Sequence, residues 1–513
     1  MCACRRFNPV SFISRFLSEI MQKRKVFKRI GLLIIILVVI LSGFLLFRTT
    51  RFTSKQVSVQ SVPLAVKDQD TTARHLASAL QFQTISILEA DQFRQFHEFL
   101  KATYPKVFAT LTLEKVNEHS LLFRWEGRAP NLKPILLVAH QDVVPVEPGT
   151  EDNWTHPPFG GHIADGYVWG RGSLDDKSGV IGILEAAELL LSEGFQPQRT
   201  MYFAFGHDEE TSGKQGAAEI SKVLQSRGLQ FECVLDEGGA VVEDYPQVPL
   251  PVALVGIAEK GYVSIKLTAK GEGGHSSMPP KQTAVGILSA ALVKLEANQV
   301  PARLEGPTRQ MFEYLGPEMS FPNRVIMANL WLFRPLVQSI LAKAPTTNAY
   351  IRTTTAPTML EGSIKDNVLP ISARAIINFR ILPGDTIDSV TRHVRQTVND
   401  PRVDVEPLTE MAANPSPTSP TDSEAFATVQ RTLHQVFPGI VVTPTLVIGA
   451  TDGRYYASLS QNVYRFLPIW IKQADTVRIH GTNERVSVKN FAQAVTFYHQ
   501  LMVNFDGKTS HSG

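Results

Sequence analysis

The stretch MYFAFGHDEE, from Met201 to Glu210, constrains the fold more than any other part of this sequence. Its apolar first half is typical of a strand buried inside a sheet. Three acids follow it, Asp208, Glu209 and Glu210, and neighbouring carboxylates repel one another. A bound divalent cation is one source of the positive charge that would balance them. A solvated acidic loop is the alternative interpretation.

Apolar runs alternate with helical patterns along much of the chain. PILLVAH ends at His140 and CVLD ends at Asp236, and both runs are typical of buried strands, while residues 178–194 have the pattern of an amphipathic helix. This alternation predicts an α/β fold with a mostly parallel sheet covered on both faces. Because ligands collect at the carboxyl ends of such strands, we expect His140, Asp236 and the three acids to converge.

The pattern changes at residue 258. GYVSIKLTAKG and SARAIINFRIL alternate as half-exposed strands do, and residues 283–297 form a helical pattern. We expect a second, α+β domain with an open-faced sheet, which adds helices in its middle part. Buried-strand patterns return after a Pro/Ser linker over 414–423. The predicted organisation is a catalytic domain, residues 73–257 and 408–505, interrupted by an inserted domain, residues 258–407.

The N-terminal segment IGLLIIILVVILSGFLLF, residues 30–47, carries no charge and is just long enough to span a bilayer as a helix. Five basic residues stand between positions 23 and 29, which favours a cytoplasmic N-terminus and a body in the periplasm, a vacuole lumen or the extracellular space. We expect a basic cytoplasmic tail over 1–29, an anchor over 30–47 and a stalk over 48–72. The alternative is a cleaved signal peptide and a secreted protein, although no small-residue cleavage site follows.

The charges of the chain are unevenly distributed. Residues 1–55 contain eleven Lys or Arg and one Glu, so the rest of the chain carries 40 basic against 47 acidic residues. A mildly acidic body is not typical of nucleic-acid binding. Cys233 is the single cysteine after position 4, which excludes an intramolecular disulfide within the body.

Several His and Asp residues stand at expected strand ends or loops. His140 and Asp142 point the same way if both are in a strand, and a metal-bound His commonly donates its second nitrogen to a carboxylate. A buried, hydrogen-bonded His is the alternative for His140, and helix capping is the alternative for Asp175 and the residue after it. With His480, these residues offer nitrogen and oxygen ligands without sulfur. Such a set suits zinc, cobalt or manganese, and its size suits a two-metal hydrolytic site.

Seven motifs together resemble one known family. They are AHQDVVPV, WGRGSLDDKSG, HDEETSG, VLDEGG, GGHSSMPP, KDNVLP and IHGTNE. Their order and spacing resemble the zinc peptidase family that includes aminoacylase, glutamate carboxypeptidase and Gly-Xaa carboxypeptidase (carboxypeptidase S). The resemblance covers roughly residues 75–505, and it is greatest to the branch of carboxypeptidase S and the N-fatty-acyl-amino acid hydrolases/synthases.

The resemblance implies two zinc ions, for which cobalt or manganese can substitute. His140 and Asp236 would hold one ion, Glu210 and His480 would hold the other, and Asp175 would bridge them.

The resemblance also implies roles beyond the ligands. Glu209 would be the general base, Asp142 would orient His140, and His275 would stabilise the oxyanion from its own subunit or across a dimer. The inserted domain would then be a lid and dimerisation domain. The candidates for gripping the substrate carboxylate are Asn367, Arg380 and Arg454.

The expected function is that of a membrane-anchored, zinc-dependent carboxypeptidase or amidohydrolase. It would cleave the amide bond next to a free C-terminal carboxylate, in short peptides or N-acyl amino acids, by means of a metal-activated water. One alternative is an N-fatty-acyl-amino acid hydrolase/synthase. A remote alternative is a non-catalytic, membrane-tethered binding protein, which is disfavoured because every expected ligand and the base are present.

Overall fold

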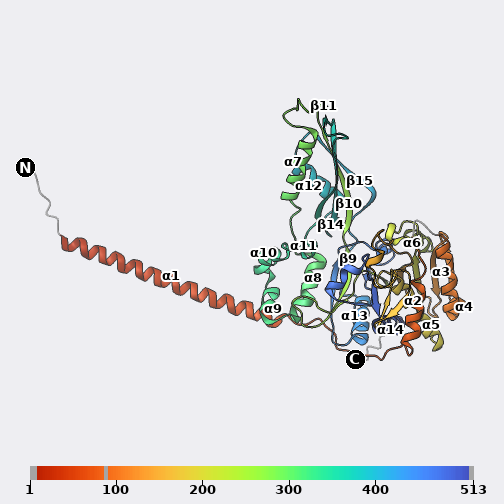
Figure 1. Ribbon diagram of the computed structural model, residues 1–513. Coiled ribbons are helices and arrows are strands. Elements are labelled where there is room, and N and C mark those ends of the chain that lie inside the picture. Colours follow the sequence, from red (N-terminus) through yellow and green to blue (C-terminus); the bar gives the residue numbers. More distant parts are fainter. Residues whose placement is uncertain (1–8, 86–89, 508–513) are drawn as a thin grey trace, which may run out of the picture.

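The computed structural model describes residues 9–85 and 90–507 (Figure 1). A mixed sheet forms the centre of the body, in the spatial order β1-β2-β6-β3-β7-β17-β9-β8-β18, with β16 paired to β9. Its strands are β1 (Thr112–Val116), β2 (Ser120–Trp125), β3 (Ile135–His140), β6 (Met201–Gly206), β7 (Cys233–Asp236), β8 (Val241–Val242), β9 (Val252–Glu259), β16 (Val441–Val447), β17 (Val463–Arg465) and β18 (Trp470–Ile471). Strands from both ends of the sequence therefore share one sheet, and the segment between β9 and β16 is an insertion.

Helices cover both faces of this sheet. The larger core joins one face to α2 (Gln69–Ala79), α3 (Ala90–Thr103), α4 (Pro105–Thr110), α5 (Lys177–Ser192), α13 (Glu424–Val436) and α14 (Val488–Asp506). A second core joins the other face to α6 (Ala217–Ser226) and the short helix η4 (Asp452–Tyr456). The predicted α/β fold with a covered, mostly parallel sheet is confirmed.

The central strands β3, β6 and β7 position the polar residues that follow them. Every residue of these strands is buried, as expected for strands covered on both faces. β3 is parallel to β6, with His140 opposite Gly206, and it is also parallel to β7, with Leu137 opposite Leu235. The carboxyl ends of the three strands therefore lie at one edge of the sheet.

A second sheet, in the order β12-β14-β10-β15, projects from the body (Figure 1). Buried and half-buried residues alternate along β10, as expected for a sheet with one covered face. Its covered face shares a separate core with two helices. These elements are β10 (Gly261–Lys270), β12 (Thr354–Glu361), β14 (Ser372–Ile381), β15 (Val403–Ala413), α7 (Ala284–Ala297) and α12 (Ile387–Val398). We call this part the inserted domain.

The middle of the insertion is helical, as the sequence predicted, but it does not pack in the core of the inserted domain. The helices are α8 (Gly306–Leu315), α9 (Phe321–Ala328), α10 (Leu330–Leu341) and α11 (Pro345–Ala349). Their buried side chains share a core with Val252 of β9 and Val441 of β16. This helical segment therefore belongs structurally to the body.

The N-terminal helix α1 (Pro9–Arg51) extends away from the body (Figure 1). Its part from Met21 to Arg51 has a mean hydropathy of 3.2 in its most apolar window, and none of that window is buried by the rest of the chain. By length and composition, α1 is able to span a membrane. A signal sequence would have the same two properties.

Candidate metal centre

Two histidines and two carboxylates meet at the carboxyl edge of the central sheet. His140 ends β3, Glu210 lies on the short helix η2 (Glu209–Thr211) after β6, and Asp175 lies in the loop before α5. The Nε2 atom of His140 is 2.9 Å from Oδ1 of Asp175, and Nε2 of His480 is 3.0 Å from Oδ2 of the same carboxylate. The same His480 nitrogen is 3.2 Å from Oε2 of Glu210. The Asp175 carboxylate therefore lies between the two histidines.

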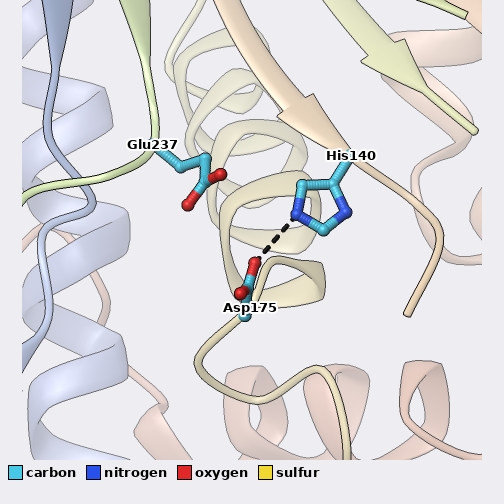
Figure 2. Close-up of side chains that lie close together, drawn as sticks. All are labelled: His140, Asp175 and Glu237. Atoms are coloured by element: carbon cyan, nitrogen blue, oxygen red, sulfur yellow. Dashed lines mark hydrogen bonds and ion pairs between the residues drawn. The ribbon is translucent and has the colours of Figure 1, made fainter. Parts of the chain in front are cut away.

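The carboxylate beside His140 and Asp175 is that of Glu237, not that of Asp236. Figure 2 shows Glu237 and Asp175 facing the His140 ring. Asp236, predicted from the sequence as a ligand, instead accepts a hydrogen bond from the backbone N–H of Gly453 at 2.5 Å. Successive residues of a strand point to opposite sides, so only one of these two acids can face the centre. The structure therefore places Glu237, and not the expected Asp236, in the group with His140 and Asp175.

The acids on either side of the ligands have supporting roles. Asp176, one residue after Asp175, caps α5 by accepting a hydrogen bond from the N–H of Gly179. Asp208 accepts hydrogen bonds from the N–H groups of Gln215 at 2.8 Å and Gly216 at 2.7 Å. Capping therefore explains one acid of the Asp pair, and closure of the loop after β6 explains the first acid of the DEE triplet.

Asp142 contacts both His140 and the acidic loop. Its carboxylate Oδ1 is 3.4 Å from Nδ1 of His140, and its backbone oxygen is 3.0 Å from the same nitrogen. The carboxylate also accepts hydrogen bonds from the backbone N–H groups of Glu209 at 3.2 Å and Glu210 at 3.1 Å. The Asp142 carboxylate therefore contacts both the histidine ring and the backbone of the acidic loop.

Charge repulsion and burial shape the titration of the centre. Burial raises the pKa of Glu209 well above its ordinary value, and the neighbouring Asp452 and Glu210 carboxylates raise it further. Burial also raises the pKa of Glu237 well above its ordinary value. The hydrogen bonds with Asp175 and Glu210 raise the pKa of His480 to about 10. Burial and the mutual repulsion of the carboxylates therefore favour their protonated forms, and Asp175 and Glu210 favour the protonated form of His480.

The ligand atoms form two groups that each suit a metal ion. One group contains His140, Asp175 and Glu237, the other contains Asp175, Glu210 and His480, and the ligand atoms within each group lie within 4.8 Å of one another. Oε1 of Glu210 is buried and has no hydrogen-bond partner among the described residues, which is costly unless a cation lies beside it. Nitrogen and oxygen donors without sulfur fit zinc or a similar ion.

A buried ion pair that the sequence did not reveal supports His480 and Asp175. The carboxylate of Glu484 accepts hydrogen bonds from Arg171 at 2.6 Å and from the backbone N–H of Leu174 at 2.7 Å. Arg171 also donates to the backbone oxygen of His480 at 3.0 Å. Glu484 is the last residue of the motif IHGTNE, but no pattern in the sequence predicts that this acid is buried.

The predicted substrate-binding residues separate into two places. Arg454 on η4 donates to the backbone oxygen of Ser212 at 2.8 Å. Burial alone would lower its pKa, but nearby acidic groups, including Glu209, raise it. Burial lowers the pKa of Arg380, and the charge of Arg454 lowers it further. Arg454 therefore lies beside the loop that follows Glu210, and Arg380 lies on β14 over the ring of Tyr262.

His275 and Asn367 lie elsewhere. His275 belongs to β11 (Gly274–His275), which pairs with β13 (Val368–Leu369), and the backbone oxygen of Asn367 accepts a hydrogen bond from the N–H of Ser276. Figure 1 shows β11 at the end of the inserted domain farthest from the body. Both residues are exposed. The structure therefore does not bring His275 or Asn367 to the metal centre of their own chain.

An apolar cavity of about 450 Å³ opens beside the centre, with Asp175 and Glu237 in its wall. The remaining wall is mostly apolar. Its larger side chains include Leu254, Tyr350, Leu446, Val447, Ile469 and Ile479. Such a cavity favours an apolar group bound next to the reacting atoms.

Comparison with known proteins gives matches along nearly the whole chain. The model of peptidase family M20/M25/M40 matches residues 136–504. A probable carboxypeptidase S-like 2 from Dictyostelium discoideum is 45% identical, covering 90% of this chain and 91% of its own. An N-fatty-acyl-amino acid synthase/hydrolase PM20D1 from Xenopus tropicalis is 42% identical, covering 93% and 94%. Carboxypeptidase S from Saccharomyces cerevisiae is 33% identical, covering 80% and 78%.

The fold is also similar to solved structures. The M20 family metallo-carboxypeptidase Sso-CP2 from Sulfolobus solfataricus superposes with a TM-score of 0.61 at 17% identity, covering 85% of this chain and 99% of that one. Human carnosine dipeptidase 1 gives a TM-score of 0.59 at 14% identity, covering 85% and 96%.

Proposed function

Because this chain belongs to peptidase family M20/M25/M40, we propose that it is a zinc-dependent hydrolase of N-acyl amino acids with apolar acyl groups. The bond cleaved is the amide next to a free carboxylate. The observation that carries the proposal is the pair of ligand groups that share Asp175, which lies in the wall of an apolar cavity.

The ligands in this proposal are His140 and Glu237 for one ion, Glu210 and His480 for the other, and Asp175 for both. Bound zinc would supply a Lewis acid for the amide oxygen and a water of lowered pKa.

The residues of the chain then handle the proton and the substrate. Glu209 lies in the acidic loop, whose backbone is held by hydrogen bonds to the Asp142 carboxylate. The Glu209 carboxylate would take a proton from the attacking water and deliver it to the leaving amine. The guanidinium of Arg454, together with that of Arg380, would bind the free carboxylate of the substrate. The same groups would serve synthesis if the reaction ran in reverse.

The cavity supports an apolar acyl group rather than a polar peptide. Its wall offers apolar side chains next to Asp175 and Glu237, so an acyl chain extending from the reacting carbonyl would be removed from water there. The similarity to a protein named as an N-fatty-acyl-amino acid synthase/hydrolase agrees with this substrate class.

A panel of substrates tests the proposal. We expect purified protein to release amino acid from N-acyl amino acids, with kcat/KM increasing from acetyl to oleoyl substrates, and to lose activity on chelation and regain it with zinc. Cleavage of dipeptides in preference to long-chain substrates would refute the substrate class. Activity that resists complete removal of metal would refute the reaction.

We further propose that α1 is an uncleaved anchor with a cytoplasmic N-terminus, as the basic residues before its uncharged run favour. Retention of α1 and resistance to alkaline extraction would support the anchor. A mature protein that starts after residue 47 would contradict it.

A homodimer is the remaining part of the proposal. His275 is exposed at the end of the inserted domain and does not reach the metal centre of its own chain. The partner subunit's His275 would then stabilise the oxyanion. Mixing an inactive Glu209→Gln chain with an inactive His275→Ala chain should restore activity in mixed dimers.

A further inference from the structure

The end of α1 is bound directly to the helices α9 and α10. The side-chain amide of Asn329, between these helices, donates to the backbone oxygen of Leu45 at 3.2 Å. The ring of Trp331 meets the ring of Phe44 edge-on, with 6.0 Å between centroids. Arg324 of α9 donates to the backbone oxygen of Phe52 at 2.9 Å. Figure 1 shows α9 and α10 beside this end of α1.

These contacts fix the depth of α10 relative to the apolar segment of α1. Leu45 and Phe44 lie inside the uncharged run that ends at Phe47, and each residue of a helix rises about 1.5 Å. Trp331 therefore meets α1 about 4–5 Å inside the end of that run. If the run lies in the hydrocarbon of a bilayer, the first turn of α10 lies at the level where the hydrocarbon meets the head groups.

The outer side of α10 is apolar, although it faces away from the rest of the protein. Leu332, Leu336 and Ile340 recur every fourth residue, so they lie on one face of the helix. Trp331 lies next to this face and is 54% exposed, and Ile340 is 55% exposed. The opposite side of the helix is packed on the body through Val337. We call Trp331, Leu332, Leu336 and Ile340 the α10 apolar face.

A basic cavity of about 530 Å³ lies between the end of α1 and the helices α8 and α10, with Trp331 in its wall. Five basic side chains line it, and Glu313 is its one carboxylate among the lining residues. The basic side chains are Arg48, Arg51, Lys55, Arg309 and Arg334. Glu313 pairs with Lys55 at 3.5 Å and with Arg309 at 3.0 Å. Arg334 also pairs, at 3.8 Å, with Glu305, which lies outside the lining. Two carboxylates cannot neutralise five cations, so the cavity attracts anions.

We propose that the α10 apolar face and this basic cavity together form a binding site for anionic phospholipid in the bilayer that α1 spans. The apolar face would contact the acyl chains, and the basic cavity would hold the phosphate head group. Helices that lie at a membrane interface commonly place aromatic side chains at the edge of the hydrocarbon and basic side chains among the head groups. The body would thereby be fixed on the membrane at two places, α1 and α10. We infer this on the premise of the anchor proposed above, and independently of the proposed catalysis.

Quenching of tryptophan fluorescence by brominated lipid tests the site in the full-length protein held in nanodiscs. We expect brominated phosphatidylglycerol to quench Trp331, so Trp331→Phe should lose the quenchable component. Trp470→Phe is the matched control, because Trp470 packs against Phe437 in the body, and it should keep that component. Equal quenching of the wild type and Trp331→Phe would overturn the proposal, as would shielding of Trp331 by a second copy of the chain.

The head-group part is tested by competition between phosphatidylglycerol and phosphatidylcholine at Trp331. The double variant Arg309→Gln, Arg334→Gln should lower the preference for phosphatidylglycerol by about fivefold per charge removed. Arg392→Gln, a matched change on the exposed side of α12, should leave it unchanged. No preference in the wild type would overturn the anionic site.

Assays on the same samples separate this proposal from the others. Hydrolysis of a short-chain, water-soluble substrate reports on catalysis, and incorporation of the chain into nanodiscs reports on the anchor. Loss of Trp331 quenching with both of these intact refutes the lipid site alone. Failure of the chain to enter nanodiscs refutes the anchor and the lipid site together.

Discussion

Replacing Glu237 and Asp236 in turn distinguishes a metal ligand from a structural acid next to it. Glu237 faces His140 and Asp175 in one ligand group, so Glu237→Ala removes one of three protein ligands. Removing a residue that only hydrogen-bonds to a metal ligand lowers metal affinity about 10–100-fold. We therefore expect that removing the ligand itself lowers zinc affinity by more than about 100-fold. The variant should retain about one zinc equivalent after dialysis and should lose hydrolysis.

Asp236→Ala should instead destabilise the fold. Its buried carboxylate accepts the N–H of Gly453, and an unpaired buried donor costs about 1–3 kcal/mol. Burial raises the pKa of Asp236. The cost of burying this carboxylate therefore offsets part of the stability that its hydrogen bond contributes. We therefore expect a free energy of unfolding lower by about 1–3 kcal/mol with zinc content unchanged.

Elemental analysis after dialysis, urea unfolding and hydrolysis of an N-acyl amino acid measure the three quantities. Asp236→Asn serves as a control that keeps the shape of the side chain. The reasoning is refuted if Asp236→Asn loses one zinc while Glu237→Ala keeps two.

Three further predictions follow from single contacts. Arg454→Ala should raise KM for N-acyl amino acids with little change in kcat and should lower kcat/KM by about 10–100-fold, because a hydrogen bond to a charged group contributes about 1.5–3 kcal/mol; an unchanged KM in steady-state kinetics would contradict the role. Glu484→Gln should lower the stability measured by urea unfolding by about 3–5 kcal/mol, because it leaves the buried Arg171 without its carboxylate; a value below 1 kcal/mol would contradict it. Burial lowers the pKa of His97 to about 4 from 6.5, so the unfolded chain takes up a proton that the native protein excludes. The stability that this residue contributes is complete above pH 6.5 and declines by up to about 3 kcal/mol as the pH falls to 4; His97→Gln should flatten that decline, and an unchanged pH profile of unfolding would refute the assignment.

The sequence predicted the sheet and the place of the site because both follow from local patterns. The apolar runs before His140 and Asp208 gave buried strands, and parallel strands bring their carboxyl ends together. The pattern could not decide between Asp236 and Glu237, because that choice depends on which side of the strand faces the loop of Asp175. A shift of one residue reverses the answer.

Long-range placement was beyond the sequence for a different reason. His275 occurs in a motif that resembles an active-site motif, yet its distance from the centre depends on how the inserted domain is held. The helices α8 to α11 were expected within the insertion, but their packing on β9 and β16 depends on tertiary contacts. A role for the exposed apolar side of α10 likewise could not be predicted, because it depends on the contact between α10 and α1.

The most direct test of the account is the zinc content and activity of Glu209→Gln. This change keeps the size of the side chain and both ligand groups, but it removes the carboxylate that would move the proton. We predict that the variant binds two zinc ions and hydrolyses N-acyl amino acids at least about 100-fold more slowly than the wild type, in line with the contribution of a general base. Activity within a few fold of the wild type, in protein that holds both ions, would contradict the proposed mechanism.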